Sequence, residues 1–287
     1  MISRSEKNKA VLKEINREKT LKLSKKLLTV TFIIAIIVIT LYLYTRFIGT
    51  SFIKTNEFII KNSAIPSTFH GIKIVHFSDI LYGSTIDNDD LDKLSKEINL
   101  INPDIIVFTG DLIFNKYDIK QEEISILTEF LNSVEAELGK YAVKGEMDSS
   151  TFDLIMNDTD FTILNNEYKL IYNKDNIPII MSGLNINNLS VPTINNQNNY
   201  YHVTLIHNYD NYSNYNTNAN LVLAGHNLGG EIKLPFTNGL LGDNQYKDSY
   251  YQNNKSEIYI SNGLGSIHKM RFFNHPSINV YRLYNYD

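Results

Sequence analysis

The segment from Ile74 to Asp111 constrains what this chain can fold into more than any other. It predicts a buried strand that ends in Asp79, an amphipathic helix with Asp90 as its N-cap, and a second buried strand that ends in Asp111. In open α/β sheets, binding sites lie at the carboxyl ends of parallel strands. Two acids brought together there repel each other unless a cation, a shared proton or a basic side chain accompanies them. The segment therefore predicts a parallel pair of strands with a polar site at its edge.

Residues 27–46 predict one membrane-spanning helix before this sheet. The run is uncharged from Leu27 to Thr45 and ends at Arg46. As a helix it would be about 28 Å long, close to the thickness of one bilayer core. A cleaved signal peptide has a shorter apolar core and a small-residue cleavage site, and neither is found. We therefore expect an uncleaved, single-pass anchor in the cell membrane.

The charge distribution predicts how this anchor is oriented. Residues 1–26 hold nine Lys and Arg and three acids, and the rest of the chain carries a net charge of -10. Positive charge before a span favours a cytoplasmic N-terminus, which places the remaining chain outside the cytoplasm. A basic tail can also bind nucleic acid. Orientation explains its position beside the span more simply, so we expect no nucleic-acid partner.

The remaining chain predicts one α/β domain behind a short stalk. The expected division is a basic cytoplasmic tail (1–26), a transmembrane helix (27–46), a stalk (47–60) and a domain (61–287), with Phe58–Ile60 as a candidate extra strand. The order βαβα followed mostly by strands predicts a sandwiched α/β domain. Because the chain has no cysteine, disulfides and thiolate metal sites are excluded. Beyond the first segment, helices are expected over 121–138 and from 152, and strands over 141–143, 177–181, 201–206, 220–224, 258–260 and 278–283.

Five expected strand ends carry side chains that bind metals. These residues are Asp79, Asp111, Glu146, His207 and His226. One histidine at the end of an apolar strand is more often structural, but five such loops together favour a common site. Carboxylates combined with imidazoles suit Mn, Fe or Zn.

The order of these residues resembles that of the calcineurin-like metallophosphoesterases, over about residues 60–287. The chain is most similar to their membrane-anchored bacterial branch, which includes UDP-diacylglucosamine pyrophosphatase-like enzymes. Family members carry, in order, D-x-H, G-D, G-N-H-[DE], a lone H and G-H-x-H. Asn102–Asp104, Ser182–Leu184 and Ser261–Gly265 also look like this branch. The resemblance implies a metallophosphoesterase-like β-sandwich flanked by helices, and two adjacent metals that activate a hydroxide and clamp a phosphate ester.

The motifs are only partly matched. Asp79, Asp111, His207 and His226 stand where the family has the same residues, and Asp148 matches the last acid of the third motif. The family's other histidines are replaced, and so is the asparagine of the third motif. The replacements are Leu81 in the first motif, Glu146 and Met147 in the third, and Leu228 in the last. Met147 occupies the position of the histidine that protonates the leaving group or holds the phosphate, so no catalytic residue is assigned.

These losses fall mainly on one of the two metals that the resemblance implies. The first metal position keeps only Asp79 and Asp111, because both of its histidines are leucines. The second position would have Asp111, Glu146, His207 and His226, and glutamate binds metal more strongly than the family's neutral amide. We therefore expect at most one divalent metal (Mn, Fe or Zn), or none.

Three functions remain open. The first is a pseudoenzyme with a binding or regulatory role, since a general acid and two metal ligands are missing. The alternative is an active single-metal hydrolase of a phosphoester or pyrophosphate near the membrane, such as a phosphorylated lipid or cell-wall precursor. In the third, Asp79 and Asp111 are only structural and are satisfied by backbone N–H groups. His268 is the one spare histidine that could approach the site, whereas His76 is expected to be structural.

Overall fold

The computed structural model describes residues 4–186, 199–212, 218–234, 245–246, 248–253 and 256–286. The chain divides into two compact units, Met1–Thr45 and Arg46–Asp287. Each unit is described by itself.

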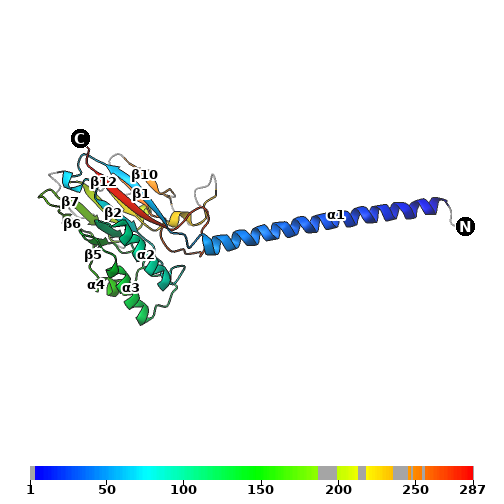
Figure 1. Cartoon of the computed structure of the whole chain (residues 1–287), viewed down its shortest axis with the longest axis horizontal. Coiled ribbons are helices and arrows are strands. Elements are labelled where there is room, and N and C mark those ends of the chain that lie inside the picture. Colours follow the sequence, from blue (N-terminus) through cyan, green and yellow to red (C-terminus); the bar gives the residue numbers. More distant parts are fainter. Residues whose placement is uncertain are drawn as a thin grey trace. The chain divides into compact units, whose positions relative to one another are not determined.

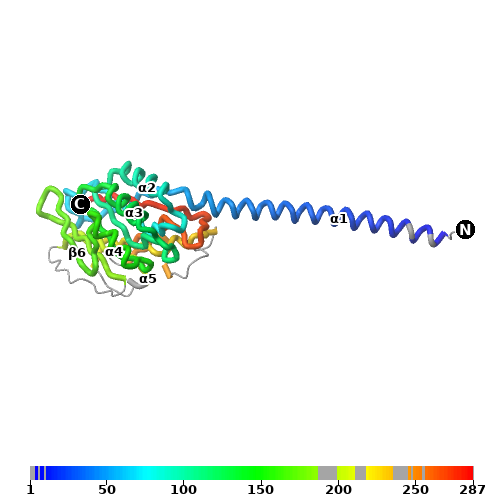
Figure 2. Tube along the Cα trace, turned by 90° about the horizontal axis from the view of Figure 1, so that it is seen from below, coloured from blue at the N-terminus to red at the C-terminus, as the bar shows by residue number. Residues whose placement is uncertain are grey.

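Unit 1 consists of the helix α1, Arg4–Leu43, which has 40 residues. It is therefore about 60 Å long, twice the thickness of a bilayer core of about 30 Å. The helix runs without a break through the boundary expected at residue 26 (Figure 2). The lysines, glutamates and leucines before this boundary are good helix formers, and the apolar run after it contains no glycine or proline that would break the helix. An 18-residue window has a mean hydropathy of 2.6, and none of it is buried. By length and composition, α1 can cross a membrane.

Unit 2 contains two six-stranded mixed sheets in the part of the chain that the structure describes. The sheets form the sandwich expected for the domain, and β1 and β12 lie side by side at one edge (Figure 1). The first sheet has the order β1 (Lys54–Lys61), β12 (Ser277–Tyr284), β2 (Lys73–Phe77), β3 (Ile105–Phe108), β4 (Lys140–Ala142) and β5 (Phe161–Ile163). The second has the order β10 (Tyr250–Gln252), β11 (Glu257–Ile260), β9 (Leu221–Ala224), β8 (His202–Ile206), β7 (Ile179–Gly183) and β6 (Glu167–Ile171).

Parallel pairing brings the expected loops to one edge of each sheet. Strands β2 and β3 are parallel, as predicted, with Phe77 opposite Phe108. Strands β3, β4 and β5 continue the parallel run, and β7, β8, β9 and β11 form another in the second sheet. The loops after β2, β3, β4, β8 and β9 carry all the candidate site residues.

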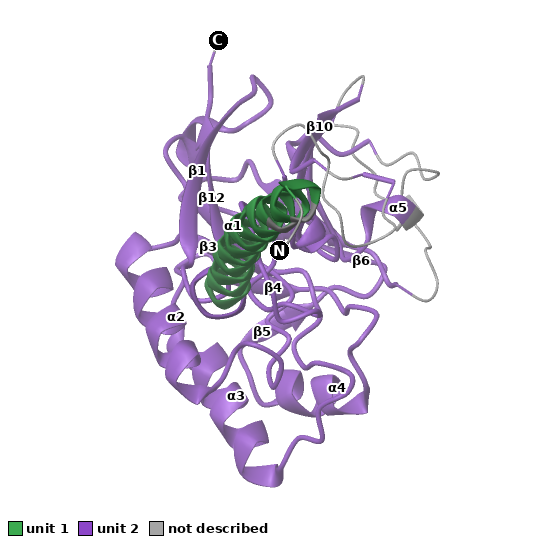
Figure 3. Cartoon of the chain, turned by 90° about the vertical axis from the view of Figure 1, so that its right-hand side faces the viewer, with its two compact units in different colours: residues 1–45 green, residues 46–287 purple. Residues whose placement is uncertain are grey.

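Three helices cover the outer face of the first sheet. They are α2 (Asn88–Ile101), α3 (Gln121–Ser133) and α4 (Ser150–Asn157), and they lie together on one side of unit 2 (Figure 3). Shorter helical turns are η1 (Tyr44–Ile48), η2 (Ser67–Phe69), α5 (Tyr209–Tyr212) and η3 (Leu228–Gly230).

The N-cap of α2 is Asp87, so the expected cap Asp90 is wrong. The Asp87 carboxylate accepts hydrogen bonds from the N–H groups of Asp89 and Asp90. Asp90 is three residues inside and accepts from the Asp87 N–H, which completes a capping box. Asp87, Asp89 and Asp90 are all residues that can cap a helix. The hydrogen bonds exchanged between Asp87 and Asp90 make Asp87 the N-cap.

Helix α3 ends at Ser133, five residues before the expected end at Leu138. The buried ammonium of Lys140 donates to the carbonyls of Leu131 and Val134 at 2.8 Å each. A lysine donor satisfies carbonyls that have no partner at a helix end. The chain then turns directly into β4.

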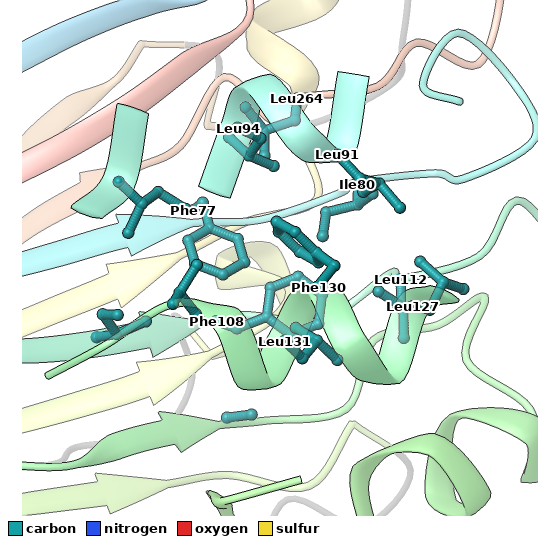
Figure 4. Close-up of a cluster of buried hydrophobic side chains, with 14 of the residues drawn as sticks. Phe77, Ile80, Leu91, Leu94, Phe108, Leu112, Leu127, Phe130, Leu131 and Leu264 are labelled. Carbon is teal, nitrogen blue, oxygen red and sulfur yellow. The ribbon is translucent and has the colours of Figure 1, made fainter. Parts of the chain in front are cut away.

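Successive side chains along a strand point to opposite faces of the first sheet, so they pack into two separate hydrophobic cores. Val75 and Phe77 of β2 face the helices, and Ile74 faces the second sheet. Phe77, Phe108, Phe130 and Leu131 lie together between β2, β3 and α3 (Figure 4). The other core fills the space between the sheets with residues such as Ile105, Val107, Met181, Val203 and Leu223.

The expected stalk over 47–60 is wrong in its second half. Lys54–Lys61 is instead the strand β1, which pairs in parallel with β12 over its whole length. Its inner side chain Ile60 is buried. Strands β5, β6 and β10 were also not expected from the sequence. Four of the five residues of β6 are exposed, so this strand lacks the alternation by which strands are found.

Because β1 belongs to the sheet, its removal should unfold unit 2. A chain that begins at Arg46 should unfold cooperatively on heating, followed by circular dichroism. A chain that begins at Asn62 should lose that transition, because β12 then has no partner at the edge and the core loses Ile60. Equal melting temperatures for the two chains would show that β1 is dispensable.

Candidate metal centre

Backbone hydrogen bonds hold the loops after β2 and β3 side by side. The Asp79 N–H donates to the Gly110 carbonyl at 2.9 Å, and the Leu81 N–H donates to the Asp111 carbonyl at 3.1 Å. Both aspartates have a left-handed backbone, with φ of 50° at Asp79 and 60° at Asp111. Non-glycine residues adopt this conformation at a cost, mainly where surrounding structure enforces it. Both acids are therefore fixed in place as soon as their strands end.

Asp111 and His207 form a buried pair. Asp111 Oδ2 lies 3.2 Å from His207 Nε2, and Asp111 Oδ1 accepts a hydrogen bond from the Met147 N–H at 2.8 Å. His207 Nδ1 lies 2.6 Å from the Thr109 carbonyl oxygen, which can only accept, so Nδ1 carries a proton. This second contact fixes the ring and leaves Nε2 as the atom that faces the site.

His226 completes a cluster of three potential ligands. Its Nδ1 lies 3.3 Å from His207 Nε2, and the two rings are nearly perpendicular. The ligand atoms of Asp111, His207 and His226 all lie within 4.8 Å of one another. These three residues come from loops after β3, β8 and β9, so the cluster joins both sheets.

Glu146 lies at the exposed rim of this cluster. Its Oε2 is 3.7 Å from His226 Nδ1, and its Oε1 accepts from the Asn208 side-chain amide at 2.9 Å. The Glu146 side chain is 41% exposed. Of the four residues expected at the second metal position, three are therefore clustered and the fourth adjoins one of them.

The charges of Asp111 and His207 stabilise each other. Burial by itself would raise the pKa of Asp111, but His207 and the Met147 N–H lower it overall. Burial would likewise lower the pKa of His207, but Asp111 and Asp79 raise it to about 10. In the absence of a metal, the pair is an imidazolium beside a carboxylate.

Asp79 lies outside the cluster of three. Its Oδ2 accepts a hydrogen bond from the His226 N–H at 3.1 Å, and the side chain is buried. Burial raises the pKa of the Asp79 carboxyl. A Cβ at Gly225 would lie 2.9 Å from Asp79 Oδ2, so the loop after β9 closes tightly over it. Asp79 therefore positions the backbone of His226.

Asp148 ties the loops after β3 and β4 together, a role that sequence reasoning did not assign. Its carboxylate accepts from the N–H groups of Asp111, Leu112 and Gly145 at 2.8 Å each. Burial and the nearby Asp111 raise the pKa of Asp148 to about 6. The signal in the sequence was its match to the last acid of the third motif.

The residues that replace the family's histidines form an apolar cluster. Leu81, Phe114 and Leu228 are buried together, with Met147, Tyr117 and Ile267 packed against them. Leu81 and Leu228 both have a φ of 48°, which is unusual for a leucine.

Neighbouring glycines close tightly over this cluster. A Cβ at Gly263 would lie 2.5 Å from Leu228 Cδ2, and a Cβ at Gly265 would lie 2.6 Å from Leu81 Cβ. The same Cβ at Gly263 would lie 2.9 Å from Asp79 Cβ, so the Leu228 side chain lies close to Asp79.

The two other histidines of interest have separate partners. His268 Nδ1 contacts the buried Glu231, whose other oxygen accepts from Ser266 Oγ at 2.6 Å. His268 is not part of the metal-ligand cluster among the described residues. His76 is buried and lies 2.9 Å from Thr109 Oγ1, so its expected structural role is confirmed. Burial lowers the pKa of His76 to about 3, which keeps it neutral.

The three clustered side chains fit a divalent metal. Ligands about 2.1 Å from a tetrahedral ion lie about 3.4 Å from one another. The distances of 3.2 Å and 3.3 Å from His207 Nε2 to its two neighbours match this spacing, and all three ligand atoms lie within 4.8 Å of one another. Two imidazoles with a carboxylate suit Zn, Fe or Mn.

Comparison with known proteins supports the same family. No family model matches the chain. It is 31% identical to the uncharacterized metallophosphoesterase YkuE of Bacillus subtilis, over 84% of this chain and 89% of that protein. It is 35% identical to the UDP-2,3-diacylglucosamine pyrophosphatase LpxG of Chlamydia muridarum, over 31% of this chain and 27% of that protein. A solved structure, TT1561 of Thermus thermophilus, covers 67% of this chain and 90% of its own, with 14% identity and a TM-score of 0.41.

The alignment to YkuE spans most of both proteins. The chain is also 30% identical to a transmembrane protein with metallophosphoesterase domain of Danio rerio, over 31% of this chain and 20% of that protein. The chain belongs to the metallophosphoesterase family.

Proposed function

We propose that this chain is a membrane-anchored metallophosphoesterase-fold protein that binds one divalent metal and has lost the hydrolytic chemistry of its family. Its role is then to bind a ligand or to regulate a partner. The observation that carries the proposal is the apolar cluster, because Leu81, Met147 and Leu228 occupy the positions of three family histidines.

The apolar cluster argues against a metal in the first position. The two side chains that would supply nitrogen there are leucines, and Asp79 already accepts a hydrogen bond from the His226 backbone. An ion placed beside buried hydrocarbon loses hydration that no ligand replaces, which is costly. Asp111 then has no second metal to bridge, and its carboxylate faces His207 on the other side.

The second position keeps its ligands. Asp111, His207 and His226 would hold the ion, with Glu146 at the exposed rim. A bound divalent metal would supply positive charge that holds an anionic oxygen. Glu146 is on the open side, so a ligand can approach there without entering the apolar cluster.

Hydrolysis should be lost because two of its requirements are missing together. A pair of metals stabilises both the attacking and the leaving oxygen, and loss of one metal removes much of that charge stabilisation. A general acid typically contributes about 10²–10⁴-fold, and the thioether of Met147 cannot donate a proton. The Asp111 and His207 side chains can therefore bind and orient, but they do not complete the family reaction.

The anchor brings this site near lipid-linked ligands. Helix α1 supports a single span, and the basic residues before it support a cytoplasmic N-terminus with unit 2 on the other side. The relative LpxG is described as a pyrophosphatase of a diacylated nucleotide sugar. We infer that the ligand is a phosphorylated lipid or cell-wall precursor.

Full-length protein in detergent should bind about one equivalent of Mn or Zn by elemental analysis. It should hydrolyse bis-p-nitrophenyl phosphate no faster than the Asp111→Ala variant, which removes a ligand shared by both metal positions. Turnover that Asp111→Ala abolishes would instead establish the single-metal hydrolase. Absence of any bound metal would leave the site purely structural.

Metal binding should release a proton and strengthen as the pH rises. The metal needs a neutral His207, yet the pKa of His207 is raised to about 10 in the metal-free chain. Between about pH 6.5 and 8.5 the affinity for Mn should therefore rise about tenfold per pH unit. Calorimetry at neutral pH in two buffers of different ionisation enthalpy should count about one proton released per ion. Affinity independent of pH would contradict the buried ion pair, and His268→Ala serves as the control that changes neither quantity.

Replacing Leu81, Met147 and Leu228 by histidine should restore a metal at the first position, in addition to the one at the second. The triple variant Leu81→His, Met147→His, Leu228→His places donors on backbone that is already left-handed at residues 81 and 228, a conformation that histidine tolerates better than leucine. We expect about two metals per chain and measurable diester hydrolysis. The matched triple alanine variant removes the same apolar bulk without adding ligands, so it should stay at one metal. Failure of the histidine variant to exceed the alanine variant would show that the apolar cluster does not mark a lost metal position.

A further inference from the structure

We propose that a small cationic pocket of unit 2, separate from the metal centre, binds the phosphate of an anionic lipid headgroup. The pocket lies between the start of β1 and the loops that follow η3 and precede β12. Its volume is about 160 Å³. The proposal rests on the membrane anchoring proposed above and does not require a metal at Asp111.

The lining carries positive charge and amide groups. Lys54 and Lys233 both line it, and none of its described lining residues is acidic. Within the described part of the chain, no carboxylate forms an ion pair with Lys54. Lys233 lies 3.8 Å from Asp248, and both side chains are exposed, so this pair is weak and can open to a competing anion.

Asparagine amides complete the donor set. Asn56, Asn262 and Asn274 line the pocket. The amides of Asn56 and Asn274 each use one hydrogen, toward Asn279 Oδ1 and the Leu228 carbonyl, and each amide nitrogen carries a second. Lysines surrounded by amide donors are suited to an oxyanion such as phosphate.

Gly229 lines the pocket, and its lack of a side chain lets two asparagines approach closely. A Cβ at Gly229 would lie 2.6 Å from Asn274 Oδ1 and 2.7 Å from Asn262 Oδ1. The side-chain oxygens of Asn262 and Asn274, which accept hydrogen bonds, therefore approach the backbone as closely as glycine permits. The buried Nδ1 of His275, which also lines the pocket, has no hydrogen-bond partner among the described residues.

The size of the pocket selects a small group. A volume of about 160 Å³ leaves room for a few small polar groups. That suits one phosphate group. Pockets for whole drug-sized ligands are typically larger, at about 300–1,000 Å³.

Exposed aromatic side chains flank the cationic pocket. Phe273 lines it and is 63% exposed. Phe52 is 60% exposed, and its ring contacts the ring of His275. Exposed phenylalanines can insert at the boundary between headgroups and acyl chains, and basic side chains there are attracted to anionic lipids. The combination favours a lipid over a soluble phosphate.

The position of Lys54 in the sequence makes this contact possible. Ten residues separate it from Leu43, the last residue of α1. Even fully extended, such a segment spans at most about 40 Å. If α1 crosses the membrane, the cationic pocket is therefore tethered close to a bilayer surface.

Hydrogen exchange of the full-length chain in lipid nanodiscs tests the proposal. Peptides that cover 228–234 and 271–277 should exchange at least about threefold more slowly in discs of phosphatidylglycerol than in discs of phosphatidylcholine. The double variant Lys54→Gln, Lys233→Gln should abolish the difference. The matched control is Lys169→Gln, on β6 at the opposite edge of the second sheet from β10, and it should keep the difference. The double variant Phe52→Ser, Phe273→Ser should reduce it.

Several outcomes would overturn the proposal. They are equal exchange in the two kinds of disc, a difference that survives the double lysine variant, and equal protection by soluble glycerol phosphate in phosphatidylcholine discs. Incorporation into either disc, followed by size-exclusion chromatography, tests the anchor separately. A chain that enters the discs but shows no lipid-dependent protection refutes the headgroup site alone, and a chain that enters neither disc refutes the anchoring and, with it, the lipid site.

Discussion

The Asp111 carboxylate is the group on which the whole edge of the two sheets depends. One oxygen accepts from the Met147 N–H and the other faces His207, while the Asp111 N–H donates to Asp148. Loops from β3, β4 and β8 thus meet at one buried charge. Such a charge needs a partner of opposite sign, which is the His207 imidazolium or a metal. The ligands of the proposed metal are therefore held together even when no metal is bound.

This edge could be predicted from the sequence because the signals for it lie in short, continuous segments of the chain. Apolar runs that end in Asp79 and Asp111 are enough to place two parallel strands with acids at their ends, and the structure confirms that pairing. Which acid joins the histidines depends on tertiary contacts instead. Asp79 is held by the His226 backbone and lies outside the cluster, and only the folded loops separate its role from that of Asp111.

Other differences have equally specific causes. β1 was expected in part as a stalk because only Ile60 in it is buried, so its pairing with β12 leaves little pattern in the sequence. Helix α3 ends early because the side chain of Lys140, which lies in the next strand, donates to the carbonyls at the helix end. Asp148 matched a motif, but its hydrogen bonds to two loops become evident only in the structure.

The apolar cluster gives this family member its distinct character. Leu81 and Leu228 keep a left-handed backbone that leucine seldom adopts, beside glycines that could not carry a side chain. The backbone at these two positions is therefore held left-handed although both side chains are apolar. The cluster of Asp111, His207 and His226 beside these leucines supports the proposal of a protein that holds one ion without turnover.

The most direct test of this account is the anomalous scattering of Mn in crystals of the chain. The account predicts a single peak bonded to Asp111, His207 and His226. A second peak beside Asp79 and Leu81, or no peak at the three clustered residues, would contradict it.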